Sequence, residues 1–147
     1  MAAEYKPRIF LDTNVLFSGL YSSRGVPATI LEEFIKGDIE IVISQQVLEE
    51  LVNTIKEKLP EALPALETLL MNMPPEVVAD PEPGDILPWR GKLSLGDASI
   101  LAAAIKVKPD YFVTGDRHFL EVSGLVKKAG LIITTPTGLL KVIDIEK

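Results

Sequence analysis

Four acidic residues occupy positions in this sequence where a carboxylate is hard to explain by solubility alone. Asp12 directly follows the apolar run Ile9–Leu11, and Asp116 follows the run YFVT by one glycine. Glu50 lies in the second turn of a segment with helical periodicity, and Asp97 lies near the start of a segment that is apolar nearly all round. Grouping like charges costs several kcal/mol unless a cation offsets the repulsion, so a shared site for these acids predicts a bound divalent metal.

The donor set limits which metal and which chemistry such a site would support. Oxygen-only ligands favour Mg²⁺ or Mn²⁺ over zinc. An ion held by carboxylates orients a phosphodiester, lowers the pKa of a bound water and stabilises the leaving oxygen, so hydrolytic phosphoryl transfer is the expected reaction class. The chain has no cysteine and one histidine, which excludes thiolate metal sites and cysteine nucleophiles and makes a multi-histidine zinc site or a Ser-His-Asp triad hard to build.

Each of the four acids also has an ordinary structural explanation when it is taken singly. Asp12 could cap the helix that follows it, and Glu50 could be a charge on a helix surface. Asp97 could belong to a capping pattern with Ser94, and Asp116 could be a turn residue. These explanations become less credible jointly, because four acids from four separate segments would have to gather at one edge by accident.

Alternating strand and helix patterns supply the framework that would gather these acids. Short β-branched or aromatic runs with turn residues nearby predict five buried strands, at residues 9–11, 39–44, 76–80, 110–116 and 131–136. Helical patterns lie between them, at residues 27–37, 44–59, 94–107 and 117–130. This alternation predicts a mostly parallel sheet covered on both faces, a three-layer α/β/α domain. Such sheets bind ligands beyond the carboxyl ends of their strands, which is the edge where the four acids fall.

Residues 60–93 interrupt the alternation. Seven of the 11 prolines lie there, and the stretch DPEPGDILPWRGK predicts an extended, stiff loop that borders the site. Trp89 beside Arg90 could stack on a base and pair with a phosphate. The alternative is that Trp89 only packs the loop onto the domain.

Length, composition and charge set further limits. The chain has 147 residues, of which 47% are hydrophobic, and these values predict a single domain over residues 1–147. No apolar run is long enough for a membrane helix and the N-terminus lacks a secretion signal, so we expect a soluble, cytoplasmic protein. The net charge is −6, with the acidic excess confined to residues 1–105. Most of this surface would repel nucleic acid unless cations or a local basic patch intervene.

The motifs that carry the four acids resemble those of the PIN-domain ribonucleases. The resemblance rests on a hydrophobic strand followed by DTN, then SQQVLEE, LSLGDASILAAA, FVTGDRHF and a closing IITTPTGLL. Order, spacing and hydrophobic context are similar over almost the whole chain. The family implies a three-layer α/β/α fold with a five-stranded parallel sheet, and Mg²⁺- or Mn²⁺-dependent endonucleolytic cleavage of RNA.

The resemblance also implies partners. Many small members are toxins of VapBC-type toxin–antitoxin pairs, so an antitoxin protein and a homodimer are expected alongside the RNA substrate. The proline-rich stretch at 60–93 is longer than in compact toxins and is closer to a broader toxin-like branch of PIN proteins.

Residue by residue, the resemblance assigns a metal-binding and catalytic set with two supporting residues. The set is Asp12, Glu50, Asp97 and Asp116, and the residues expected to support it through hydrogen bonds are Asn14 and Thr114. Glu49 is the rival to Glu50, but the family's spacing from the strand-end serine falls on Glu50.

Other assignments stay open at this point. His118 could act as a general acid or be a structural turn residue. Arg117, Lys127 and Lys128 could contact an RNA backbone or form a solvated helix face. A phosphatase of the haloacid dehalogenase type fits less well, because DTN lacks the second aspartate two residues on. A catalytically silent PIN fold that binds RNA or protein is the alternative outside the enzymes.

Overall fold

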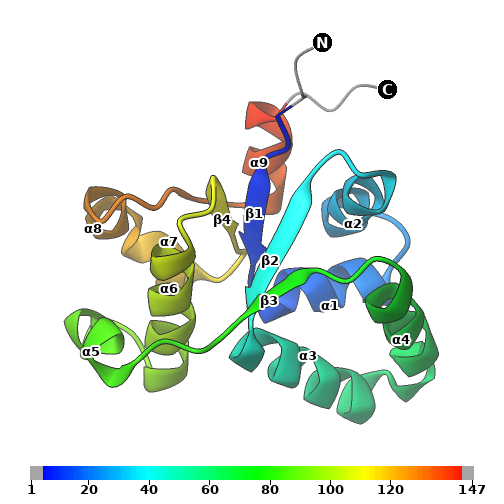
Figure 1. Ribbon diagram of the computed structural model, residues 1–147, viewed down its shortest axis with the longest axis horizontal. Coiled ribbons are helices and arrows are strands. Elements are labelled where there is room, and N and C mark those ends of the chain that lie inside the picture. The colour runs from blue at the N-terminus through cyan, green and yellow to red at the C-terminus, as the bar shows by residue number, and fades with distance from the viewer. Residues whose placement is uncertain (1–4, 144–147) are drawn as a thin grey trace.

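The computed structural model describes residues 5–143 and contains a five-stranded, entirely parallel sheet in the order β3-β2-β1-β4-β5. The strands are β1 (Arg8–Leu11), β2 (Glu40–Ser44), β3 (Glu76–Val78), β4 (Tyr111–Val113) and β5 (Ile133–Thr134). Helices cover both faces, with α1 to α4 on one side and α5 to α8 on the other (Figure 1). The predicted three-layer α/β/α architecture with five parallel strands is therefore confirmed.

Within the described residues, eight α-helices and two short 3₁₀ helices lie between the strands, and a ninth α-helix follows the last strand. The α-helices are α1 (Thr13–Tyr21), α2 (Val26–Lys36), α3 (Gln45–Lys58), α4 (Leu63–Asn72), α5 (Pro83–Ile86), α6 (Leu95–Val107), α7 (Arg117–Glu121), α8 (Ser123–Lys128) and α9 (Pro136–Val142). The 3₁₀ helices are Pro60–Ala62 and Leu87–Trp89. None of the helices in residues 5–143 combines the length and the apolar character needed to cross a membrane.

The strand order places a topological switch point between β1 and β4. The chain proceeds outward from β1 to β2 and β3, and then returns through α6 to place β4 on the other side of β1. The connections after β1 and β4 therefore diverge at the carboxyl edge of the sheet. In parallel α/β sheets this kind of switch point is where ligands bind.

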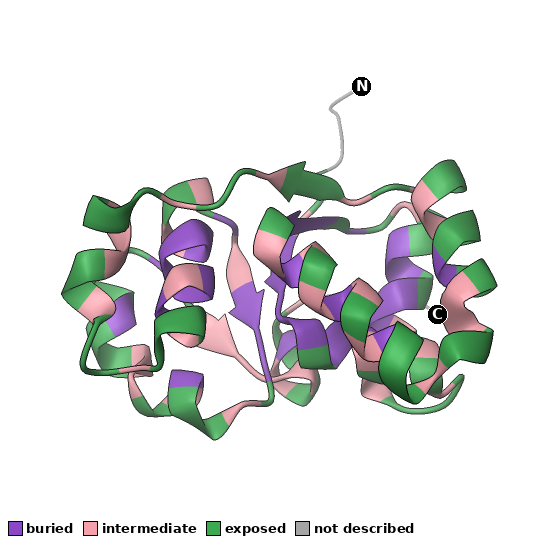
Figure 2. Cartoon of the chain, turned by 90° about the horizontal axis from the view of Figure 1, so that it is seen from below, coloured by how far each residue is buried: buried purple, intermediate pink, exposed green. Residues whose placement is uncertain are grey.

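The sequence places its most apolar runs in this central region. Ile9, Phe10 and Leu11 of β1 are fully buried, as expected for a strand with helices on both faces. Six of the 13 residues of α6, all between Ala98 and Ala104, are buried, in keeping with its all-round apolar pattern. Figure 2 shows the buried residues along the central strands and on the helix faces turned toward them, whereas β3 is largely exposed at one edge.

Three aromatic rings connect the strands on either side of the switch point with α7. The rings of Phe10 and Phe112 meet edge to face with centroids 5.4 Å apart, and Phe112 and Phe119 do so at 5.0 Å. All three side chains are fully buried or nearly so. Asp12 follows β1, and Asp116 lies between β4 and α7. By packing these three elements together, the ring cluster holds the backbone segments that carry the two acids in place.

The prediction of a proline-rich loop segment at 60–93, extended over DPEPGDILPWRGK, was wrong. The segment contains α4, α5 and the two 3₁₀ helices in addition to β3. Prolines stand in the first turn of each of these helices, where the missing N–H has no helical partner and the fixed φ suits the helix. The proline pattern therefore marks helix starts as well as turns.

The single helix predicted over residues 117–130 was also wrong. The chain forms two short helices there, α7 and α8, separated at Val122. The Val122 N–H bonds to the Phe119 carbonyl in the tighter 3₁₀ manner, and Ser123 and Gly124, which are weak helix formers, follow.

Truncating the central ring should weaken the fold strongly. We expect Phe112→Ala to lower the free energy of unfolding by about 3–5 kcal/mol, since it leaves a cavity between two other rings. The matched control Ile35→Ala, at a side chain that is half exposed, should stay within about 0.5 kcal/mol of the parent. Urea unfolding followed by circular dichroism measures both, and equal losses in the two variants would contradict the role assigned to the ring cluster.

Candidate active site

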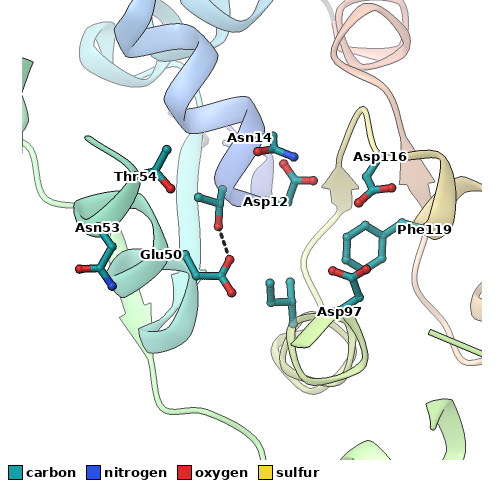
Figure 3. Close-up of a pocket in the computed structure, with 10 residues that line it drawn as sticks. Asp12, Asn14, Glu50, Asn53, Thr54, Asp97, Asp116 and Phe119 are labelled. Atoms are coloured by element: carbon teal, nitrogen blue, oxygen red, sulfur yellow. Dashed lines mark hydrogen bonds between the residues drawn. The ribbon is translucent and has the colours of Figure 1, made fainter. Parts of the chain in front are cut away.

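A polar cavity of about 290 Å³ lies at the carboxyl edge of the sheet, at the switch point between β1 and β4. Its walls come from α1, α3, α6 and α7 (Figure 3). The lining residues are Asp12, Thr13, Asn14, Glu50, Asn53, Thr54, Asp97, Ile100, Asp116 and Phe119. The structure thus brings to one cavity the four acids that the sequence singled out.

Asp12 is the most deeply placed of these acids, with 3% of its surface exposed. It is the N-cap of α1, and its Oδ1 accepts the N–H of Val15 at 3.0 Å. Its Oδ2 accepts a hydrogen bond from the Thr114 hydroxyl at the end of β4. The capping explanation of Asp12 is therefore correct, but it accounts for only one of the two carboxylate oxygens.

Burial raises the pKa of Asp12 above that of an ordinary aspartate, because the charged form loses its hydration. The hydrogen bonds from Thr114 and Val15 act in the opposite direction, since they favour the carboxylate. The negative charge of Asp116 raises the pKa further. Asp12 is thus a buried acid whose charge is only partly offset by the protein itself.

Glu50 projects from α3 toward the cavity and is held by two neutral donors. The Thr13 hydroxyl donates to its Oε1 at 2.9 Å, and the Gln46 side-chain amide donates to its Oε2 at 3.0 Å. Glu49, by contrast, is exposed and pairs with Gln45 at 3.3 Å, outside the cavity that contains Glu50. The helix therefore presents Glu50, and not its neighbour, to the site.

Asp97 lies in the first turn of α6, where its N–H bonds to the Ser94 hydroxyl at 3.2 Å. Ser94 caps α6 through this bond, but no hydrogen bond among the described residues joins the Ser94 N–H to the Asp97 carboxylate. That carboxylate faces the cavity instead (Figure 3). Partial burial raises the pKa of Asp97, and the charges of Asp116 and Glu50 add to this effect.

Asp116 is the N-cap of α7 and is anchored through the same threonine as Asp12. Its backbone N–H donates to Thr114 Oγ1 at 3.0 Å, and its Oδ1 accepts the N–H of His118 at 2.8 Å. The His118 ring nitrogen Nδ1 lies 3.0 Å from the same oxygen. The Thr114 hydroxyl thus donates to the Asp12 carboxylate and accepts the backbone N–H of Asp116. In this way it links the end of β1 to the segment that follows β4.

The spacing within the site is uneven. Asp97, Asp116 and His118 each offer one ligand atom within 4.8 Å of one another, the only such group found among the described residues. Asp12 and Glu50 face the same cavity from other sides (Figure 3). The potential ligands on α6 and α7 therefore lie close together, and Glu50 on α3 lies on the opposite side of the cavity.

The two residues expected to support the acids differ in what they do. Thr114 makes the expected hydrogen bonds. Asn14 lines the cavity close to Asp12, but no hydrogen bond among the described residues joins its side chain to any of the four carboxylates. Its amide is therefore free to face whatever enters the cavity.

Sequence reasoning missed three residues that shape this site. Thr13 and Gln46 hold Glu50, and Phe119 closes the cavity beneath Asp116. The i,i+4 spacing of Gln46 and Glu50 on one helix face was a usable signal for their hydrogen bond. The contact from Thr13 depends on how α1 packs against α3, which no local pattern encodes.

The donor chemistry of the site fits a hard divalent cation. The four cavity acids supply carboxylate oxygens, the ligands that Mg²⁺ and Mn²⁺ prefer, and His118 adds one nitrogen at the rim. A cation would also offset the desolvation and mutual repulsion that raise the pKa of Asp12 and Asp97. No lysine or arginine lines the cavity in the part of the chain that the structure describes.

Comparison with known proteins is consistent with this geometry. A family model described as PIN domain matches residues 8–118, a span that includes all four acids. No curated protein sequence matches the chain closely enough to count as a relative.

Two solved structures share the fold over nearly the whole chain. VapBC2 from Rickettsia felis, solved bound to a DNA fragment from its promoter, aligns with a TM-score of 0.59 at 18% identity over 87% of this chain and 98% of that one. FitAcB from Neisseria gonorrhoeae aligns with a TM-score of 0.60 at 19% identity, covering 88% and 98%. At such low identity these likenesses establish the fold alone.

Removing the buried charge should stabilise the metal-free protein. Because the pKa of Asp12 is raised in the folded state, its contribution to stability is fully present below the unfolded value of 3.8 and is lost as the pH rises through the folded value. Asp12→Asn escapes this loss, so in EDTA at pH 7 it should melt at a higher temperature than the parent, with the gain shrinking as the pH falls.

Thermal unfolding from pH 3.5 to 8 measures the effect. The exposed Glu32→Gln is the charge-matched control and should show no such pH-dependent gain. An Asp12→Asn variant that melts below the parent at pH 7 would show that the Asp12 charge is compensated within the protein.

Proposed function

This chain belongs to the PIN-domain family, and from that premise we propose that it is a Mg²⁺- or Mn²⁺-dependent endoribonuclease. The observation that carries the proposal is the convergence of Asp12, Glu50, Asp97 and Asp116, from four separate segments, on one cavity at the sheet edge. Nuclease activity is general in the family. The metal and the preference for RNA are inferred from the site and from the resemblance.

The four carboxylates would hold the cation, which when bound supplies charge neutralisation at the phosphate and a more acidic water. The protein's own part is to keep the carboxylates in place before the substrate arrives. Asp12 is fixed by Thr114 and Val15, and Glu50 by Thr13 and Gln46, so little reorganisation is needed during the reaction.

The cavity is polar and open to solvent, and residues from the first three turns of four helices line it. Without a cation its acids would repel a polyanion, so metal loading and phosphate binding would be coupled. The exposed cations Arg117 and Lys92, on α7 and just before α6, lie on the segments that flank the acids and could meet the backbone on either side.

We further propose that the protein is the toxin of a VapBC-type pair and forms a homodimer. The structural similarity to VapBC2 and FitAcB supports the toxin role, since the names of both denote assemblies with a second protein. The homodimer is proposed from the family resemblance. A short gene that overlaps the upstream end of this one and encodes a basic DNA-binding protein would favour the toxin role. An isolated gene would favour RNA processing, and light scattering of the purified protein tests the dimer.

Purified protein should cleave single-stranded RNA internally when Mn²⁺ or Mg²⁺ is present and should be inactive in EDTA. Asp12→Asn, Asp97→Asn and Glu50→Gln should each lower the cleavage rate by roughly 10²-fold or more, because the metal's several kcal/mol of charge stabilisation depends on these ligands. A fluorescently labelled RNA resolved on a denaturing gel measures the rate.

Glu49→Gln is the matched control for Glu50→Gln, because it neutralises the adjacent acid of α3 outside the cavity, and it should retain parental activity. Circular dichroism establishes that the variants are folded. Full activity of the Asp12 and Asp97 variants, or of the parent in EDTA, would refute the proposal. Parental protein that binds no Mn²⁺ at millimolar concentration would favour a silent PIN fold that binds RNA or protein.

A further inference from the structure

Gln46, a residue of the first turn of α3, makes two hydrogen bonds with one side-chain nitrogen. Its Nε2 donates to Glu50 Oε2 at 3.0 Å and to the backbone carbonyl of Gly96 at 3.1 Å. A carboxamide nitrogen carries two hydrogens, and both are used here. Since Gly96 directly precedes Asp97, this amide connects the helix that carries Glu50 to the turn that carries Asp97.

The backbone of Gln46 is itself fixed by a residue distant in sequence. Its N–H donates to Asp80 Oδ1 at 2.9 Å, and the next N–H, that of Val47, donates to the Ser44 hydroxyl at 3.3 Å. Both N–H groups belong to the first turn of α3, where they have no acceptor within the helix. The backbone that carries the Gln46 side chain is therefore held in place by hydrogen bonds.

Glu50 is in this way restrained from three elements. Thr13 of α1 binds its Oε1, Gln46 binds its Oε2, and Gln46 is in turn held against α6. A glutamate has three side-chain torsions and would otherwise sample many positions at the cavity wall. Neutral donors on both oxygens fix its direction and leave its negative charge intact for a cation.

We propose that Gln46 is a positioning residue for the metal site, which acts by holding Glu50 at a fixed separation from the Asp97 turn. The inference rests on the proposed function of this cavity. It assigns to Gln46 a contribution to metal affinity and to the rate of cleavage, without contact with the metal or the RNA.

The neighbouring residue provides an internal comparison. Gln45 bonds to Glu49 at 3.3 Å with the same i,i+4 geometry on the same helix. That pair lies outside the cavity with the four acids and has no partner on α6 among the described residues. Any general effect of removing a glutamine from the first turn of α3 should therefore be equal at the two positions.

The test compares Gln46→Met with Gln45→Met, in which the side chain keeps its length and loses its donors. Mn²⁺ binding to the whole protein is measured by titration calorimetry, and cleavage by initial rates over a range of RNA concentrations. Gln46→Met should weaken Mn²⁺ binding about tenfold or more. It should lower kcat with little change in KM for RNA, whereas Gln45→Met should match the parent within about twofold.

Two further measurements separate positioning from mere support of the fold. In EDTA both variants should unfold at the same urea concentration as the parent, since neither Gln45 nor Gln46 is fully buried. In a Glu50→Gln background, Gln46→Met should add little to the loss of Mn²⁺ affinity, because its effect passes through Glu50. Gln46→Glu, which keeps the shape and cannot donate, should behave like Gln46→Met or worse.

The outcomes are distinguishable. Parental Mn²⁺ affinity and kcat in Gln46→Met would overturn the inference while leaving the proposed nuclease intact. A loss of stability in EDTA with unchanged Mn²⁺ affinity would assign Gln46 a purely structural role and also overturn it. If the parental protein itself neither binds Mn²⁺ nor cleaves RNA, both the proposed function and this inference fall together.

Discussion

The pairing of β1 with β4 is the constraint on which the site depends. Parallel registry sets Leu11 opposite Val113, and the Asp12 N–H continues the ladder by bonding to the Val113 carbonyl at 3.3 Å. The next residue on each strand is therefore Asp12 on one side and Thr114 on the other, close enough for the buried hydrogen bond between them. A buried carboxylate at this position is tolerated because the apolar strands beneath it supply the stability that its desolvation removes.

The opposite wall of the cavity is built by different means. Glu50 does not follow a strand directly, and its place is set by side-chain hydrogen bonds from Thr13 and Gln46. The proline-rich stretch contributes here as well, because Asp80 binds the first turn of α3 and so holds the start of the helix on which Glu50 stands. This gives residues 60–93 a structural link to the site. Trp89 is partly buried and packs against the core.

The sequence predicted the location of a site residue correctly where that location depends only on its place after a strand. Asp12 and Asp116 could be placed at the sheet edge because each follows an apolar strand run, and parallel strands end together. The helices within 60–93 were missed because prolines were interpreted as loop residues, while at a helix start proline is favourable. The hydrogen bond from Thr13 to Glu50 could not be foreseen, because it depends on the packing of α1 against α3. The division of 117–130 at Val122 did have a local signal, the weak helix formers Ser123 and Gly124, but the apolar periodicity that runs across the segment favoured a single helix.

The central claim is that the carboxylates of the four cavity acids form a binding site for a hard divalent cation at the switch point of the sheet. A crystal grown with Mn²⁺ and measured at the manganese absorption edge tests it most directly. The account predicts an anomalous difference peak within about 2.0–2.4 Å of carboxylate oxygens from Asp97, Asp116 or Asp12, in the cavity that Glu50 closes. A peak that occurs only elsewhere, or no peak at millimolar Mn²⁺ with the four acids ordered, would contradict it.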